Sequence, residues 1–75
     1  MNGGEAPTDE VLTAICGRLT DESLFVRMQS TASLERIGTS RQGTCLETAL
    51  SQEEDETSCN GMKQVLKSLK SRSAP

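Results

Sequence analysis

The chain contains no histidine, no tryptophan and no tyrosine, and a single phenylalanine among its 75 residues. The absence of histidine excludes His-based acid–base catalysis and His metal sites. The shortage of aromatic side chains removes the groups that contribute most burial to a small core. A chain of this length buries only about 60% of its unfolded surface on folding, so we expect at most one domain with a marginal core.

Long apolar runs are also missing. No segment approaches the roughly 20 consecutive apolar residues that span a bilayer. Residues 1–7 are small, polar and acidic, without the basic start and apolar run of a signal peptide, and we expect them to form a disordered lead. These features predict an intracellular protein, cytoplasmic or nuclear, with no membrane partner.

Basic residues are outnumbered, 8 against 11 acidic ones, which gives a net charge of −3. This balance argues against a nucleic-acid partner, because a phosphate backbone needs a basic face. The acidic run 53–56 is typical of a solvated loop. The cations that follow it suit the last turns of a helix, where the macrodipole favours them, and phosphate binding is the alternative. These cations are Lys63, Lys67, Lys70 and Arg72.

Cysteine is present as Cys16, Cys45 and Cys59, an odd number at wide spacing that makes a poor disulfide framework. Without a signal peptide, this pattern predicts free thiols in a reducing compartment. Cys16 and Cys45 stand beside aliphatic residues and are expected to be small buried hydrophobic groups. No cysteine pair has the short spacing of zinc ligands, so we expect no metal and no cofactor.

Two segments before residue 39 show the helical period. Thr8 is expected to cap the first helix. The apolar stripe of that helix comprises Val11, Leu12, Ile15, Cys16 and Leu19. After a polar break, a second helix is expected from residue 23 or 24 to Ile37, where Gly38 would end it in the left-handed conformation. The two helices would form an antiparallel helical hairpin over residues 8–38.

The second half, residues 39–70, predicts short amphipathic helices around an acidic loop. Thr44 is expected to cap a helix from residue 45 to about 52, and residues 51–61 to form a mobile acidic loop. Ser58 or Asn60 would cap a last helix, and residues 71–75 would form a disordered tail. The apolar stripe of this last helix comprises Met62, Val65, Leu66 and Leu69. No alternating pattern predicts a strand, so the fold class expected is all-α.

The most specific stretch is residues 19–38, and it resembles a HEAT repeat, the two-helix unit of α-solenoids. The residues that carry the resemblance are Leu19, Asp21, Val26, Arg27, Ser30, Ser33, Leu34, Ile37 and Gly38. The resemblance implies that Asp21 and Arg27 form a polar ladder to neighbouring units. The alternatives are a simple helix cap for Asp21 and an exposed helix residue for Arg27.

Stacked repeats cover one another's apolar faces, and about three are usually needed for stability. We therefore expect a truncated repeat protein, an assembly with itself or another protein, or a partly folded chain. The function predicted is that of a non-catalytic protein–protein interaction module, a short or truncated helical-repeat scaffold protein. Partner-binding candidates are Val26, Leu34, Ile37, Met62, Val65, Leu66 and Leu69. The alternative is that these residues form two apolar stripes, one on each of two helices, that pack against each other.

A second functional hypothesis is a small, partly disordered regulator that folds on binding and is controlled by phosphorylation. Ser51 precedes Gln52 and two glutamates, which resembles kinase target sites. A phosphate there would add nearly two negative charges to an acidic segment. An enzyme is not expected, because the sequence offers no nucleophile–base pair, no phosphate-binding glycine loop and no small-molecule substrate site.

Overall fold

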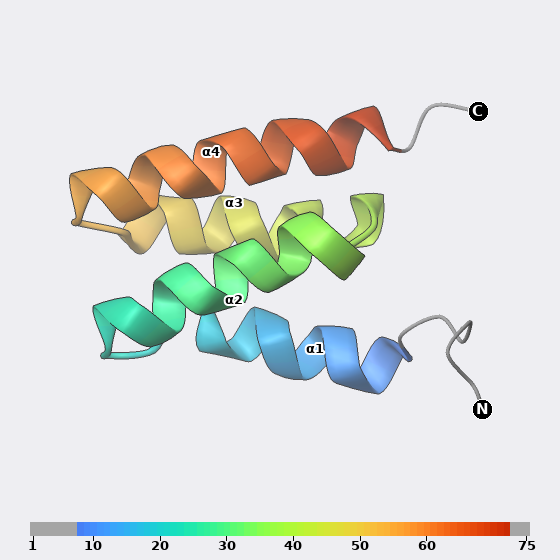
Figure 1. Ribbon diagram of the computed structural model, residues 1–75, viewed down its shortest axis with the longest axis horizontal. Helices are drawn as coiled ribbons and strands as arrows, with labels where there is room; N and C mark the ends of the chain where they lie inside the picture. Colours follow the sequence, from blue (N-terminus) through green and yellow to red (C-terminus); the bar gives the residue numbers. More distant parts are fainter. Residues whose placement is uncertain (1–7, 73–75) are drawn as a thin grey trace.

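The fold is all-α, as the sequence predicts, in a computed structural model that describes residues 8–72. The elements are α1 (Asp9–Arg18), α2 (Leu24–Ile37), the short 3₁₀ helix η1 (Ser40–Gln42), α3 (Gly43–Gln52) and α4 (Glu56–Ser71) (Figure 1). No strand occurs between residues 8 and 72. The expected lead at 1–7 and residues 73–75 of the expected tail lie outside the described residues.

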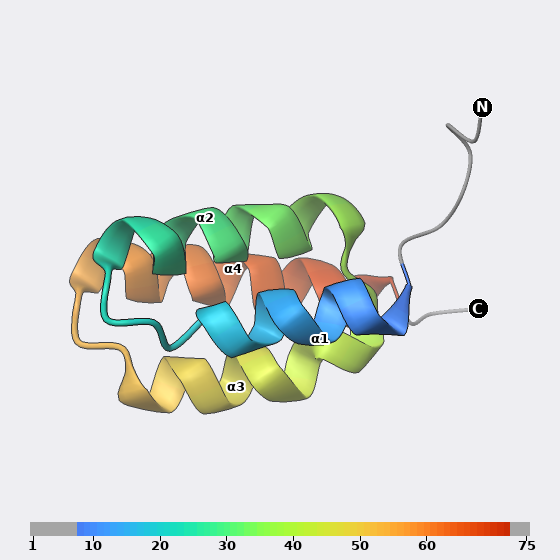
Figure 2. The ribbon, with the colours of Figure 1, turned by 90° about the horizontal axis from the view of Figure 1, so that it is seen from below.

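The helices form two antiparallel hairpins that stack on each other. α1 and α2 make the first hairpin, and α3 and α4 make the second (Figures 1 and 2). α2 packs mainly against α4, and α1 lies beside α3 (Figure 2). The chain thus builds two layers, with α1 and α3 in one and α2 and α4 in the other.

The predicted cap of α1, Thr8, is confirmed, whereas α2 is capped by Ser23 and not by Asp21. The Thr8 hydroxyl accepts a hydrogen bond from the Val11 amide (3.2 Å), and the Ser23 hydroxyl accepts one from the Val26 amide (3.3 Å). Each hydroxyl satisfies a backbone N–H that has no partner within the first helical turn. Local cap chemistry therefore fixes where both helices begin.

The predicted caps of the second hairpin are wrong. Thr44 lies inside α3, which follows directly from η1, and η1 is itself started by a capping box between Thr39 and Gln42. α4 is capped by Asp55, whose carboxylate accepts from the Ser58 amide at 2.8 Å. The helix consequently begins before both expected caps, Ser58 and Asn60.

The acidic stretch 51–61 is therefore mostly helical, not a mobile loop. Only residues 53–55 connect α3 to α4. Asp55 at the cap and Glu56 in the first turn place negative charge where the helix N-terminus favours it, so acidity here begins a helix. At the other end, Ser71 is helical and Arg72 is hydrogen bonded, so the expected disordered tail does not begin at residue 71.

Gly38 ends α2 in a different way from that predicted. Its φ of −73° and ψ of 163° are extended and not left-handed. A Cβ at this position would lie 2.6 Å from the Leu34 carbonyl oxygen and 3.3 Å from Leu69 Cδ2. Glycine is needed because the chain passes so close to α2 and α4.

The core lies between the two hairpins and draws apolar side chains from all four α-helices. Its buried members are Leu12, Leu19, Leu34, Leu46, Ala49, Met62, Val65 and Leu69. Leu34, Leu46, Met62 and Leu69 are fully inaccessible to solvent. The second hairpin therefore supplies the apolar cover that one hairpin alone would lack.

A disulfide joins Cys16 of α1 to Cys45 of α3, so the prediction of free thiols is wrong for these two residues. The stacking of the hairpins brings their Cα atoms to 5.9 Å, within the range that a disulfide requires. The two residues are 29 positions apart, and their pairing depends on tertiary structure that local spacing does not reveal. Cys59 is free and half-buried.

Among the described helices, none is long and apolar enough to cross a membrane.

Candidate protein-interaction surface

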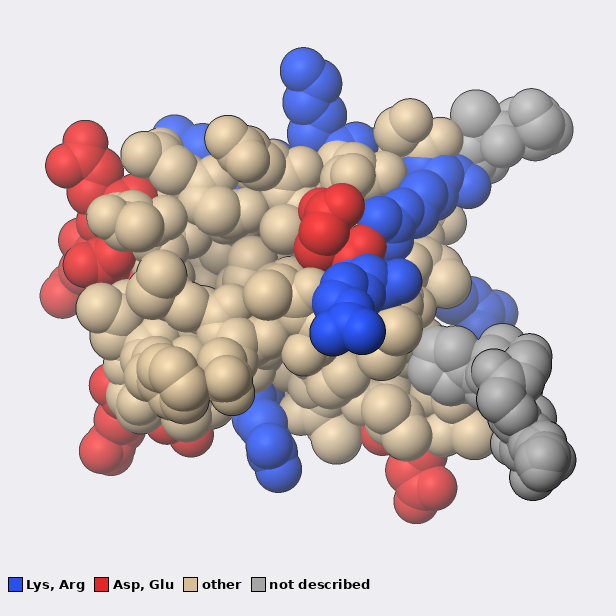
Figure 3. Space-filling view, in the orientation of Figure 1, with Lys and Arg blue, Asp and Glu red and all other residues tan. Residues whose placement is uncertain are grey.

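A groove of about 490 Å³ runs between α2 and α4. It exists because short side chains face each other there, among them Thr31 and Ala32 on α2 and Gly61 on α4. The remaining lining residues are Met28, Glu35, Thr57, Ser58, Gln64, Val65 and Ser68. Figure 3 shows this surface as an uncharged, hollowed region with charged side chains toward its ends.

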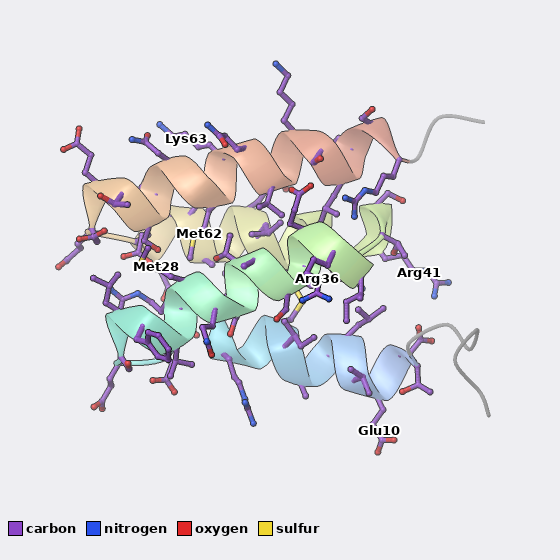
Figure 4. All side chains as sticks on the ribbon, in the orientation of Figure 1. Glu10, Met28, Arg36, Arg41, Met62 and Lys63 are labelled. Atoms are coloured by element: carbon purple, nitrogen blue, oxygen red, sulfur yellow. A yellow bond between two sulfur atoms is a disulfide. The ribbon has the colours of Figure 1, made fainter. Side chains whose placement is uncertain are left out.

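Two large apolar side chains are exposed near the start of α2, and one of them, Met28, lines the groove. Phe25 is 67% exposed and Met28 is 41% exposed, although both are large and apolar. Residues 25, 28 and 32 are spaced by three and four, so they share one face of the helix. This face ends in Arg36, and Figure 4 shows Met28 near the start of α2 and Arg36 near its end. Contiguous exposed apolar surface marks interaction sites, and aromatic side chains are enriched among the residues that contribute most to binding.

A buried ion pair closes the groove at its first end. Arg27 Nε and Nη2 donate to the two carboxylate oxygens of Glu53, at 2.8 and 3.1 Å. The Glu53 side chain is only 2% exposed and also accepts from Ser58 Oγ (3.0 Å) and the Asp55 amide (3.1 Å). α2, the linker and α4 are therefore joined through one carboxylate.

This environment lowers the pKa of Glu53 from its ordinary value of 4.5. Burial alone raises the pKa, because it disfavours the charged form. The hydrogen bonds from Arg27, the Asp55 amide and Ser58, together with the charge of Arg27, outweigh burial. The carboxylate is consequently ionised at neutral pH and acts as a fixed structural anion.

A second cluster closes the other end of the groove. Arg72 Nη1 donates to the Gly38 carbonyl oxygen (3.0 Å), and Nη2 donates to the Glu35 carbonyl oxygen. Arg72 Nη2 also forms an ion pair with the Glu35 carboxylate at 3.3 Å, and Ser68 donates to the same carboxylate. These bonds satisfy carbonyl groups that the end of α2 leaves without a helical partner.

Most of the predicted partner-binding residues lie in the core. Leu34, Met62, Val65 and Leu69 are buried, so they are not available to a partner and this part of the prediction is wrong. Ile37 and Leu66 are partly buried and pack against the same core, and Val26 is half-buried. The reason is that each stripe covers the other across the stacked hairpins, as the alternative interpretation held.

The two predicted ladder residues have different roles. Arg27 reaches the second hairpin through Glu53, and it also donates to the carbonyl oxygens of Asp21 and Glu22 (2.9 and 3.0 Å). The Asp21 carboxylate instead accepts from the amide of Ser23 in its own turn (2.8 Å). Between the hairpins, the anion facing Arg27 is thus Glu53.

Ser51, the predicted phosphorylation site, lies in the last part of α3. It is exposed, and its hydroxyl donates to the Thr48 carbonyl oxygen at 2.7 Å. The structure does not bring it into the groove or into either end cluster. In the described part of the chain, no group of three or more Cys, Asp or Glu side chains is arranged to hold a metal ion.

Two residues of this surface were not identified as functional candidates from the sequence. Phe25 lies beside the expected core stripe of α2, and its pairing with Met28 and Ala32 at helical spacing was the available signal. Glu53 was assigned to a solvated acidic run, and nothing local marks it as the partner of Arg27.

No family model, curated protein or solved structure matches this chain.

Proposed function

We propose that this chain is a non-catalytic protein–protein interaction module, with the groove between α2 and α4 as its binding surface. The observation that carries the proposal is the exposure of Met28, which lines the groove, and of Phe25, which lies about one turn before it on α2. Large apolar side chains such as Phe25 and Met28 are unfavourable in water unless another surface covers them. The partner is another protein or a second copy of this chain.

We further propose that the two hairpins are HEAT-like repeat units. The parallel layers of α1 with α3 and of α2 with α4 support this interpretation. The bond from Arg27 to Glu53 supports it too, because it links one hairpin to the turn of the next. The prediction of a reducing compartment was based on free thiols, and the Cys16–Cys45 disulfide removes that basis. The proposal therefore does not depend on a cytoplasmic or nuclear location.

Site-specific photocrosslinking in cells tests the function. Benzoylphenylalanine replaces Met28 beside the groove, or Thr13 on the exposed side of α1 as the matched control. We expect position 28 to form discrete adducts with identifiable proteins, including this chain itself, and position 13 to form none of them. Equal labelling from both positions, or no protein adduct from position 28, would contradict the proposed surface.

A further inference from the structure

The exposed face of α2 has a pattern that complements itself when reversed. Phe25, Met28, Gln29, Ala32 and Arg36 are all exposed and lie on one side of the helix. The midpoint of its uncharged part, from Phe25 to Ala32, falls between Met28 and Gln29. Phe25 and Ala32 are equally far from that midpoint on opposite sides, so a bulky group on one side corresponds to a small group on the other.

The charges follow the same symmetry. Asp21 and Glu22 lie just before α2, and Arg36 lies in its last turn, at a similar distance on the other side of the midpoint. Glu35 is also at this end, but its carboxylate is already paired with Arg72. Figure 3 shows acidic side chains at the left end of this view, then an uncharged region, and right of centre basic side chains on either side of an acidic patch.

We propose that α2 and its groove bind a second copy of this chain in an antiparallel, two-fold symmetric dimer. This inference deepens the proposed function and depends on it. In a symmetric dimer, residues near the axis meet their own copies, so they must be free of like charges. Met28 and Gln29, which would lie at the axis, meet that condition.

The groove gives the second copy a specific place to bind. The Phe25 ring of each copy enters the groove of the other beside Ala32, where Thr31 and Gly61 leave room. Asp21 and Glu22 of each copy then face Arg36 of the other. Opposite charges at both ends favour the antiparallel arrangement and disfavour the parallel one, which would bring like charges together.

Analytical ultracentrifugation of the full chain, from micromolar to several hundred micromolar, tests the dimer. We expect a reversible dimer whose dissociation constant rises at least about tenfold in Phe25→Glu and in Ala32→Glu. Val11→Glu is the matched control, because Val11 is an exposed apolar residue of α1 outside this face, and it should leave the dimer unchanged. All three positions are exposed, so helicity by circular dichroism should not change.

A charge exchange tests the orientation. Glu22→Arg and Arg36→Glu should each weaken the dimer, and the double variant E22R/R36E should restore it to within a few-fold of the original. Cys59→Ser should dimerise like the original chain, and loss of the dimer in that variant would show an intermolecular disulfide and overturn the proposal.

Two further outcomes would also overturn it: a chain that stays monomeric at every concentration, or a dimer that survives Phe25→Glu. A monomer whose position 28 still crosslinks to another protein in cells would refute the dimer and leave the proposed function standing. No dimer and no adduct from position 28 would refute both.

Discussion

Replacing the Glu53 carboxylate tests whether the cluster at the first end of the groove holds the hairpins together. Glu53→Gln keeps the size of the side chain and removes its charge. The carboxylate now accepts four hydrogen bonds, two of them from Arg27. An amide retains one accepting oxygen and turns an NH₂ group toward donors, so at least one bond to Arg27 or its neighbours is lost.

The expected cost follows from the strength of these bonds. A hydrogen bond to a charged group contributes about 1.5–3 kcal/mol, and removing one partner of a fully buried ion pair costs about 3–5 kcal/mol. The Arg27 side chain is 20% exposed, so water partly compensates it. We therefore expect Glu53→Gln to lower the free energy of unfolding by about 2–3 kcal/mol, which is about 10–20 °C in Tm for a domain of this size.

The lowered pKa of Glu53 gives this prediction a pH dependence. The folded protein holds the proton less tightly than the unfolded chain, so the ionised carboxylate stabilises the fold at pH values above 4.5. That contribution disappears as the pH falls through the lowered pKa. Glu53→Gln cannot ionise, so its stability should depend less on pH across this acidic window.

Urea and thermal unfolding followed by circular dichroism measure both effects. Glu54→Gln is the matched control, because Glu54 is the adjacent residue and is exposed. A double-mutant cycle with Arg27→Met should show coupling, with the double variant less destabilised than the sum of the two single variants. If Glu53→Gln costs no more than Glu54→Gln, or if the cycle shows no coupling, the cluster does not join the hairpins.

Three other perturbations test the fold. Gly38→Ala should destabilise the protein by about 1–3 kcal/mol, because the added Cβ would collide with the Leu34 carbonyl oxygen. Gly17→Ala should stabilise the protein by about 1 kcal/mol, because Gly17 lies in α1 with open space around it. Chemical denaturation of the two variants measures both changes. Reduction of the Cys16–Cys45 disulfide should lower the free energy of unfolding by about 3–4 kcal/mol, because the unfolded chain is no longer held in a loop that spans 29 positions. Equal thermal melts with and without reductant would refute this expectation. Leu34→Ala should cost about 2–5 kcal/mol in stability, whereas Phe25→Ala should change the stability of the dilute protein by less than about 0.5 kcal/mol; similar losses in both would contradict the assigned burial.

The first hairpin could be predicted from sequence because local chemistry defines it. Thr8 and Ser23 cap their helices through bonds to residues three positions away, and the period of apolar residues marks the buried faces. The end of α2 at Ile37 was also predictable, although Gly38 serves a close approach and not a left-handed turn. Short-range interactions of this kind are written within a few neighbouring residues.

The features that the sequence concealed all depend on the stacking of the two hairpins. Cys16 meets Cys45, and Arg27 meets Glu53, only after distant segments pack together. The same stacking buries Leu34, which in a single hairpin would be left exposed. The start of α4 is different, because Asp55 followed by Glu56 is itself a helix-start signal, and it was hidden by the interpretation of the acidic run as a loop.

The two arginine clusters have a consequence for how tightly the groove can bind. Arg27 fixes the beginning of α2 through Glu53, and Arg72 fixes its end through Gly38 and Glu35. With both ends of the helix anchored, sliding of α2 along α4 would break both sets of bonds. The cavity is therefore preorganised, and an incoming side chain meets a site that needs little rearrangement, which reduces the entropy lost on association.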